Sequence, residues 1–525
     1  MATRTRARAA ARSDRAPYER DVDEFLAAIL DEQYRNLAGL SDESGLAPIY
    51  ERYAGLFERA NLDALRTAFE AGGDEQERNR ALLAFVTDGY LNHAVAELSD
   101  AVATAESRAV VMWRGEPIRY RGARERISTT SERGERNALF AAWLQAVEAI
   151  NPIRAERLEV LHEAARSLGY DDYVEMVRVT RGWNPDEVAA VTRGALNDSE
   201  TGYYAAMRRL LARVGIEHGD GSLADAWHVL RGTGWDAWFE LRKLVPTLEA
   251  TLSELGIELR GQFGATLDLD PRPNKSPRAF CAPVRVPGDV RLVVNPHGGW
   301  DDLGAALHES GHLEHFLQVP AGTPASLAVL GDDSVTEGYG VLLESLLGEP
   351  EWLEERLGMA EADQVAFVDF MALFTLARLR RLGGQLIYEL GLHRGREEAI
   401  HRALYAGTLG LLAGVRYPEE LYLSSVDDAL YSGTYLRAMM LAGAADQALA
   451  ARHPGGWWRS REAGQTLREL FARGTAWNAE QVVAHLGYDG LDWRPVLRKI
   501  RTQLIGEMSG YGGPNITTRA GTRKV

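Results

Sequence analysis

Apolar residues recur at helical spacing through most of this chain, and this periodicity restricts it to a mainly α fold. In the 18–37 segment, Val22, Phe25 and Ile29 repeat every three or four residues, as one face of an amphipathic helix requires. Within residues 18–255 no convincing run alternates between apolar and polar residues, which is the pattern of a half-buried strand. We therefore predict that this half of the chain is all α.

Breaks in the periodicity divide the chain into separate helices. Asn151-Pro152 is expected to end one of them, because an interior proline removes a hydrogen bond and clashes with the preceding turn. No repeat of fixed period is present, which argues against a solenoid. The predicted helices cover 18–37, 48–57, 63–70, 75–107, 132–149, 153–168 and much of 186–255, then 350–359, 362–382, 396–412 and 493–507.

Residues 261–300 have a different character. Glycine, proline and β-branched residues concentrate there, and two apolar runs, 279–286 and 290–294, flank Pro287-Gly288-Asp289. This pattern predicts a β-hairpin. An edge strand of such a hairpin could pair main chain to main chain with an extended peptide, or the hairpin could simply close a core.

The composition limits the classes of function. A chain of 525 residues exceeds one simple core, so we expect two or three domains or one large helical body. The net charge of −16 argues against a nucleic-acid partner, because phosphate binding needs clustered lysine and arginine. The single cysteine, Cys281, excludes an intramolecular disulfide and suits a reducing compartment, and we expect its thiol to be buried and inert.

The basic N-terminal segment fits a disordered tail, and its composition also leaves an organellar transit peptide open. Met1–Arg15 contains five arginines and lacks the apolar stretch of a secretory signal. No apolar run reaches the roughly 18 residues that a membrane span needs. We predict disordered tails at residues 1–17 and 508–525, no membrane partner and a cytoplasmic location.

The sequence His308-Glu309-Ser310-Gly311-His312 lies in a predicted helix over residues 301–318. Residues four apart share a helical face, so both imidazoles can bind one small cation. Glu309 is rotated by about 100° from His308 and can lie beside the ion without ligating it. This is the arrangement of a zinc hydrolase, in which a carboxylate takes the proton of an activated water. The alternative is a helix that carries two ordinary histidines.

A catalytic zinc site needs a third protein ligand, and Glu337 is placed to supply it. The segment 319–324 contains two prolines and a glycine and must leave the helix, and a second helix starts near Asp332. An antiparallel return would bring Glu337 beside the histidines. Ser334-Val-Thr-Glu337 also fits a capping box, in which Glu337 would only bond to the backbone. Spacing does not separate the two interpretations.

Glu344 lies two turns beyond Glu337, about 10 Å along the helix axis, and is too far away to share the ion. It could orient a ligand histidine through a hydrogen bond, or it could be a solvated glutamate.

Taken together, His308-Glu-Ser-Gly-His312, Glu337 and Glu344 resemble the zinc-binding pattern of the thimet-oligopeptidase family and its angiotensin-converting-enzyme-like relatives. His315 also occurs in that family's helix. The resemblance extends from about residue 278 to residue 441. It implies one Zn²⁺ per chain, held by His308, His312 and Glu337 as in gluzincin peptidases.

The resemblance also implies an overall architecture. We expect a large helical two-lobed body with a deep central channel and a small sheet beside the zinc helix. The lobes would be an N-terminal helical lobe at 18–260 and a catalytic lobe at 261–507. Such a channel admits short peptides and excludes folded proteins.

The segment 427–436 is similar to the tyrosine-rich segment of this family and contains Tyr431 and Tyr435. The two share a helical face, and a phenol near zinc can donate a hydrogen bond to a developing oxyanion. A pair of half-buried aromatic residues is the alternative. The family usually has a histidine several residues earlier, but residues 417–427 contain none, so Tyr422 or a rearranged loop could take its place. Glu314 is a second departure, because an apolar residue is usual there.

These observations predict a zinc-dependent metallopeptidase that hydrolyses short peptides, with Glu309 as the general base that passes a proton from water to the leaving amine. Tyr431 or Tyr435 would stabilise the oxyanion. Three alternatives stay open: a helical zinc protein with a structural or interaction role, a hydrolase of non-peptide amides, and a carboxypeptidase. The missing histidine before the tyrosines favours the first.

Overall fold

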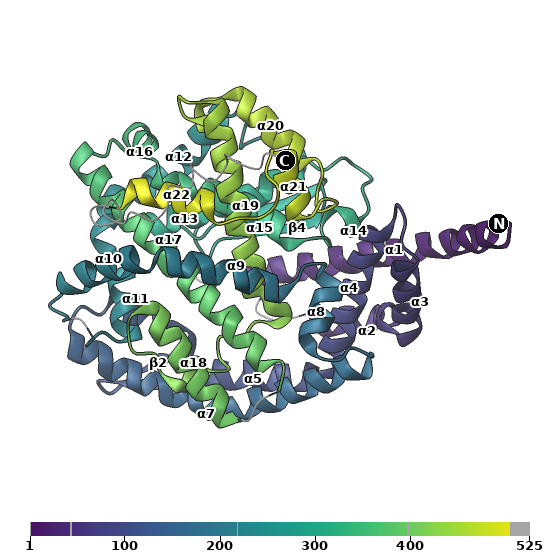
Figure 1. Ribbon diagram of the computed structural model, residues 1–525, viewed down its shortest axis with the longest axis horizontal. Coiled ribbons are helices and arrows are strands. Elements are labelled where there is room, and N and C mark those ends of the chain that lie inside the picture. Colours follow the sequence, from purple (N-terminus) through teal and green to yellow (C-terminus); the bar gives the residue numbers. More distant parts are fainter. Residues whose placement is uncertain (1, 42–44, 218, 273, 396–397, 505–525) are drawn as a thin grey trace, which may run out of the picture.

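The structure is a computed structural model that describes residues 2–41, 45–217, 219–272, 274–395 and 398–504 (Figure 1). The described chain is mainly helical, with one two-stranded and one three-stranded sheet, so the predicted mainly α class is confirmed. Within the described residues, every helix is either too short or too polar to cross a membrane.

Helices dominate the first half of the chain. They are α1 (Ala2–Leu37), α2 (Leu46–Arg52), α3 (Arg59–Glu70), α4 (Gln76–Ala94), α5 (Ala96–Arg108), α6 (Tyr120–Thr129), α7 (Arg133–Ser167), α8 (Tyr173–Arg181), α9 (Pro185–Asp198), α10 (Glu200–Ala212), α11 (Leu223–Arg231) and α12 (Leu241–Glu254), with 3₁₀ turns η1 (Ala54–Phe57) and η2 (Thr233–Trp238).

Helices resume after a short β region. They are α13 (Trp300–Leu317), α14 (Ala325–Ala328), α15 (Asp333–Glu344), α16 (Pro350–Leu357), α17 (Glu361–Leu392), α18 (Glu398–Ala413), α19 (Tyr431–Arg452), α20 (Arg461–Phe471), α21 (Ala479–His485) and α22 (Arg494–Gln503), with 3₁₀ turns η3 (Ser345–Gly348), η4 (Glu419–Leu421), η5 (Asp428–Leu430) and η6 (Trp457–Arg459).

The helix α7 runs through Pro152, so the predicted break at Asn151-Pro152 is wrong. Val147, Ile150 and Leu161 are buried on both sides of the proline. The Asn151 amide also donates to the carbonyl oxygen of Glu420 (2.8 Å). Packing on both sides therefore outweighs the one backbone hydrogen bond that a proline removes.

A β-hairpin in the first half contradicts the prediction of an all-α segment. Strands β1 (Val110–Trp113) and β2 (Glu116–Arg119) pair antiparallel around a two-residue turn. The turn residues Arg114 and Gly115 both have positive φ, 54° and 81°, as a type I′ turn requires. Strands of four residues are too short for an alternation of apolar and polar residues to be recognised in the sequence.

Two helix boundaries near the N-terminus also differ from the prediction. The predicted helix at 75–107 divides at Val95 into α4 and α5. The helix α1 begins at Ala2, where we predicted a disordered tail at 1–17, and this stretch is dominated by alanine and arginine, which are strong helix formers. The predicted tail at 508–525 lies outside the described residues.

A three-stranded sheet precedes α13 and contains the predicted hairpin. Strand β4 (Phe280–Arg285) pairs antiparallel with β5 (Asp289–Val293), and β3 (Ala265–Asp268) pairs parallel with the other side of β5. The order is β3-β5-β4, so β4 is an edge strand. It contacts both α1 and α13, which places the sheet edge beside the His-Glu-x-x-His helix.

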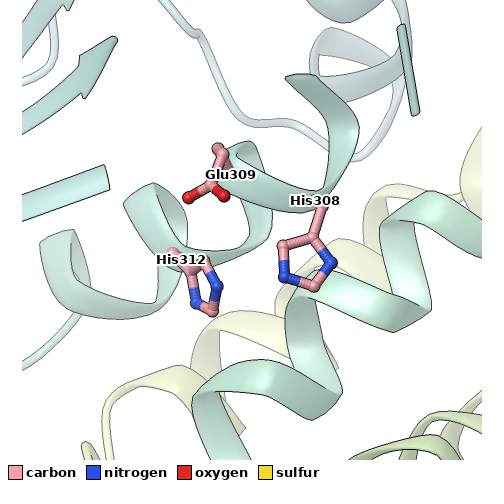
Figure 2. A group of neighbouring side chains, drawn as sticks. All are labelled: His308, Glu309 and His312. Carbon is pink, nitrogen blue, oxygen red and sulfur yellow. The ribbon is translucent and has the colours of Figure 1, made fainter. Parts of the chain in front are cut away.

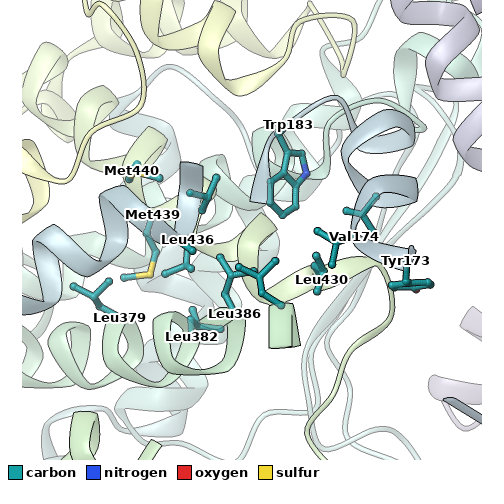
Figure 3. Close-up of a cluster of buried hydrophobic side chains, with 14 of the residues drawn as sticks. Tyr173, Val174, Trp183, Leu379, Leu382, Leu386, Leu430, Leu436, Met439 and Met440 are labelled. Carbon is teal, nitrogen blue, oxygen red and sulfur yellow. The ribbon is translucent and has the colours of Figure 1, made fainter. Parts of the chain in front are cut away.

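The helix α17 contributes to all three large hydrophobic clusters of the described chain. Its middle packs with α19, where Leu379 and Leu386 lie near Leu436 and Met439 (Figure 3). Its first turns, at Phe367, join the cluster around α13 and α15, and its last turns join the cluster around α6 and α7. Figure 1 shows α7 at one edge of the molecule and α20 and α21 towards the opposite edge, with α17 between them.

Candidate metal centre

The helices α13 and α15 approach each other closely at two glycines. A Cβ atom on Gly311 would lie 2.6 Å from the carbonyl oxygen of Tyr339. A Cβ atom on Gly340 would lie 2.8 Å from the imidazole of His308. Only residues without a side chain permit this separation, and it brings the side chains of α15 within reach of the histidines of α13.

The structure brings together the three residues predicted as metal ligands. Figure 2 shows both imidazoles on the same side of α13, with their ring centroids 4.9 Å apart. The Oε2 atom of Glu337 lies 3.2 Å from Nε2 of His308 and 4.0 Å from Nε2 of His312. All three side chains are mostly shielded from solvent.

The capping-box interpretation of Glu337 is wrong. The N-cap of α15 is Asp332, whose carboxylate accepts from the backbone N–H of Ser334 (3.0 Å). Ser334 lies inside the helix, and its hydroxyl accepts from Arg437 (3.0 Å). Glu337 is therefore free of any capping role and is turned towards the histidines.

Each imidazole is also held at its other nitrogen. Nδ1 of His308 lies 3.3 Å from Oε2 of Glu344, and Arg378 donates to the same oxygen at 2.9 Å. Nδ1 of His312 lies 2.8 Å from the hydroxyl of Thr336. Glu344 thus takes the orienting position that the sequence suggested. Thr336 was not predicted, because its position beside His312 depends on how α15 packs against α13.

This donor set fits a zinc ion. Ligands about 2.0–2.1 Å from zinc in tetrahedral geometry lie roughly 3.3 Å from one another, and the two distances from Oε2 of Glu337 are 3.2 and 4.0 Å. Partners that hold the remote nitrogens of ligand histidines are typical of zinc centres. Two imidazoles and one carboxylate are also the ligand types of catalytic zinc sites.

Glu309 lies close enough to be a rival third ligand. Ligand atoms of His308, Glu309 and His312 all fall within 4.8 Å of one another. Glu337 is the other candidate, because a single oxygen of this residue lies 3.2 Å from Nε2 of His308 and 4.0 Å from Nε2 of His312. Glu309 also lies beside the backbone of Cys281 on the edge strand β4.

The carboxylates around His308 dominate the electrostatics of the centre. Burial opposes the charged imidazole, but the hydrogen bonds and charges of Glu337 and Glu344 raise the pKa of His308 to about 10. Burial and the neighbouring His308 lower the pKa of His312 to about 3. The centre therefore favours positive charge between the carboxylates.

The acidity of Glu309 differs from that of Glu344. Burial raises the pKa of Glu309 to about 7. Burial would also raise the pKa of Glu344, but the Arg378 charge and the bond to His308 outweigh it and lower this pKa to about 2. Glu309 therefore has the near-neutral proton affinity that a general base needs, whereas Glu344 remains ionised.

Tyr431 and Tyr435 both lie beside Glu337. The Tyr431 hydroxyl donates to Oε1 of Glu337 (2.9 Å). The rings of Tyr431 and Tyr435 pack edge to face, with their centroids 5.2 Å apart. The Arg378 guanidinium lies over the Tyr435 ring, 5.6 Å from its centroid. The hydroxyl of Ser432, next to Tyr431, donates to the buried carboxylate of Glu389 (2.6 Å), which fixes the start of α19.

Other residues singled out in the sequence lie away from the imidazoles or serve the core. His315 is buried against Phe316 and Tyr339. Glu314 is buried and accepts from Gln262 (2.8 Å), which explains how a carboxylate occupies a position that is usually apolar. Tyr422 is buried beneath the Arg402 guanidinium, in the cluster around α6 and α7.

Cys281 lies on β4, and burial raises the pKa of its thiol well above the usual value, as expected for an inert cysteine. A cavity of about 100 Å³ borders Glu344 and Arg378 and extends to Lys499 of α22. The two histidines and Glu337 are not among its lining residues, so it lies behind the groups that support the centre.

Comparison with known proteins does not assign this chain to a family. No model of a known protein family matches its sequence, and no curated protein is significantly similar to it. The resemblance to thimet oligopeptidases therefore depends on the residues and the geometry of this chain alone.

Proposed function

We propose that this protein is a zinc-dependent metallopeptidase that hydrolyses peptide bonds of short peptides, similar to the thimet oligopeptidases. One observation carries the proposal: Nε2 of His308 and Nε2 of His312 both face Oε2 of Glu337, at 3.2 and 4.0 Å. Thr336 and Glu344 hold the opposite ring nitrogens. The ligand types, their burial and their support all suit a catalytic metal.

In this proposal His308, His312 and Glu337 hold one Zn²⁺. When bound there, zinc would lower the pKa of a water molecule and polarise the scissile carbonyl. Thr336 and Glu344 orient the two imidazoles by their Nδ1 atoms, and Arg378 keeps Glu344 ionised.

Glu309 moves the proton. Its carboxylate takes a proton from the attacking water and passes it to the nitrogen of the leaving amine, so that it acts first as general base and then as general acid. Its pKa of about 7, which results from burial, suits both directions of transfer near neutral pH.

Tyr431 and Tyr435 are the candidate donors to the oxyanion that develops on the scissile carbonyl. Tyr431 donates to Glu337 in the present arrangement, so it would exchange this acceptor for the substrate oxygen. Such donors act where charge develops and are worth about 2.7–4 kcal/mol each in related chemistry. Tyr435 lies one helical turn away on the same face of α19.

The substrate would lie along β4. This strand is the edge of its sheet, and Cys281 on it lies beside Glu309, so an extended peptide added there would pass the general base. We further propose the two-lobed body with lobes at 18–260 and 261–507, and a deep channel between them that selects short peptides. The single cysteine supports a cytoplasmic location.

Replacing Glu309 by glutamine tests the proposal. We expect Glu309→Gln to bind zinc as the wild type does and to lose at least 10²-fold in kcat on a quenched peptide library. Glu314→Gln is the matched control, because Glu314 is a buried glutamate of the same helix that faces Gln262 instead of the centre.

Undiminished turnover by Glu309→Gln would refute the assignment of the base. Zinc binding without hydrolysis of any peptide by the wild type would favour a structural zinc protein. Hydrolysis of small amides alone would favour a non-peptide amidohydrolase.

A further inference from the structure

The backbone just before Tyr431 has an uncommon conformation. Ala429 and Leu430 both have positive φ, 58° and 54°, and Tyr431 follows them as the first residue of α19. In the part of the chain that the structure describes, the only other non-glycine residue with positive φ is Arg114, in the tight turn between β1 and β2. A Cβ atom makes the left-handed region unfavourable, so two such residues in succession persist only where their surroundings impose the conformation.

The start of α19 has no capping side chain. Its N-cap is Leu430, which is fully buried and offers no acceptor to the first N–H groups of the helix. Leu430 instead lies in the same hydrophobic cluster as Val174 and Trp183 (Figure 3). A helix end without a cap frays easily, so the position of Tyr431 depends on contacts from outside its own helix.

Two side chains from the N-terminal half of the chain hold this turn. The backbone N–H of Ala429 donates to the hydroxyl of Tyr173, the first residue of α8, at 2.9 Å. Arg157 of α7 donates with both terminal nitrogens to the two carboxylate oxygens of Asp428, at 3.1 and 2.6 Å. Tyr173 is itself fixed, because it is buried and stacks on His393 with the ring centroids 4.5 Å apart.

A third contact comes from α17. Glu389 accepts from the backbone N–H of Asp427 (3.3 Å) and from the hydroxyl of Ser432 (2.6 Å), one on each side of the left-handed pair. The backbone is therefore held before, within and after the turn by side chains of three helices. The residue that the turn delivers, Tyr431, donates to Oε1 of Glu337 at 2.9 Å.

We infer that Tyr173 and Arg157 are positioning residues for Tyr431. They hold the chain in a left-handed turn that it would otherwise leave, and this turn keeps the Tyr431 hydroxyl at the metal centre. The inference rests on the proposed function, because it concerns a phenol that would donate to the oxyanion. It also separates the two tyrosines, since Tyr435 lies one turn inside α19 and does not depend on the turn in this way.

Tyr173→Phe removes the hydroxyl that accepts from Ala429 and keeps the ring. We expect kcat on a peptide selected from the quenched library to fall about 10-fold, with KM and zinc content unchanged, because only the donor to the oxyanion is displaced. Arg157→Gln should have the same effect. Tyr203→Phe is the matched control, because Tyr203 is a similarly buried tyrosine whose hydroxyl donates to the Ala413 carbonyl (2.9 Å).

Two further variants exclude a merely structural role. In a Tyr431→Phe background, adding Tyr173→Phe should change kcat less than about two-fold, because the positioned group is already absent. Adding Ala429→Gly to Tyr173→Phe should restore most of kcat, since glycine adopts a φ of 58° without the strain that alanine bears. Adding Arg114→Gly instead relieves the same conformation in the β1–β2 turn and should restore nothing.

Nitration by tetranitromethane, located by mass spectrometry, follows Tyr431 without any substrate. Tyr431 is half-buried and its hydroxyl is hydrogen-bonded, so it should react slowly in the wild type. We expect it to react about 5- to 10-fold faster in Tyr173→Phe, where the turn opens locally, and slowly again when Ala429→Gly is added.

Unchanged kcat and nitration in Tyr173→Phe would overturn the inference. So would a loss of kcat that is equally large in the Tyr431→Phe background, or a failure of Ala429→Gly to restore either measurement. Failure of the proposed function gives a different result, because the wild type then hydrolyses no peptide while the nitration pattern of the variants persists.

Discussion

Each imidazole of the centre has a hydrogen-bond partner on its Nδ1 side, and the two partners differ in charge. His308 meets the carboxylate of Glu344, and His312 meets the neutral hydroxyl of Thr336. A carboxylate raises the basicity of a ligand more than a hydroxyl does, so the two ligands are not equivalent. Thr336 mainly fixes the direction of the His312 ring.

Removing the Thr336 hydroxyl should loosen the metal without unfolding the protein. We expect Thr336→Val, which keeps the shape of the side chain, to weaken zinc binding about 10- to 100-fold in a competition titration against a chelator. Thr466→Val is a suitable control, since Thr466 is a half-buried helical threonine of α20 whose hydroxyl donates to the Glu462 carbonyl of its own helix. Unchanged zinc affinity in Thr336→Val would show that His312 needs no such partner.

Glu389 should make stability depend on pH. It is fully buried, and burial raises its pKa to about 7. Between the unfolded pKa, about 4.5, and the folded pKa, about 7, the folded state binds the extra proton, so the free energy of unfolding falls as the pH rises through this window. The Glu389 contribution is fully present below pH 4.5 and is lost above pH 7.

Glu389→Gln should remove this dependence. Relative to wild type, its free energy of unfolding should rise by up to about 3 kcal/mol between pH 5 and pH 8. Urea denaturation at both pH values measures the difference, and comparison with wild type cancels other buried carboxyls such as Glu314. The same pH dependence in both proteins would contradict the protonated state of Glu389.

At the residue scale, the sequence was sufficient to bring the proposed ligands together but not to identify the groups that support them. The i, i+4 spacing of His308 and His312 determines a shared helical face wherever the helix lies. Glu337 needed the antiparallel return of a second helix, and the capping box offered a rival interpretation until Asp332 was found at the N-cap. Thr336 depends on the rotation of α15 about its own axis, which no local pattern encodes.

At the scale of elements, the crossing of α13 and α15 decides whether the ligands meet. The crossing is close because Gly311 faces the Tyr339 carbonyl and Gly340 faces the His308 ring. A glycine inside a helix normally costs about 1 kcal/mol relative to alanine. Glycine at both contact points indicates that the close approach of α13 and α15 outweighs that cost.

Gly340→Ala should therefore damage both stability and metal binding. The new methyl group would lie 2.8 Å from the His308 imidazole, which cannot retreat without leaving Glu337 or Glu344. We expect a loss of about 1–3 kcal/mol in the free energy of unfolding, together with weaker zinc binding.

Gly194→Ala on α9 is the matched control, because nothing lies within 4 Å of its added Cβ, and it should stabilise by up to about 1 kcal/mol. If Gly340→Ala behaved like Gly194→Ala in both assays, the close crossing would not be what positions His308.

Helices and strands could be predicted from the sequence where the apolar pattern extends over many residues and tertiary contacts do not decide the local structure. The helix that carries the histidines and the hairpin at 280–293 follow the sequence pattern. The continuation of α7 through Pro152 depends on packing at Val147 and Leu161, which local rules on proline do not include. The strands β1 and β3 have only four residues each, and they become ordered through their partners rather than through their own pattern.

At the scale of the whole molecule, α17 connects the core to the site. It enters all three large hydrophobic clusters, and it also carries Arg378 and Glu389. One helix therefore carries both Arg378, which holds Glu344, and Glu389, which holds the start of α19. Composition predicted a large acidic protein and periodicity a mainly helical one, but the role of α17 arises from contacts between residues far apart in the sequence.

The zinc content of the purified chain tests the central claim most directly. We expect one zinc per chain in the wild type and in Glu309→Gln, and little or none in His312→Ala or Glu337→Ala, with peptide cleavage found only in the wild type. A wild type that takes up no zinc, or a His312→Ala variant that holds zinc as tightly as the wild type, would contradict a metal centre built from His308, His312 and Glu337.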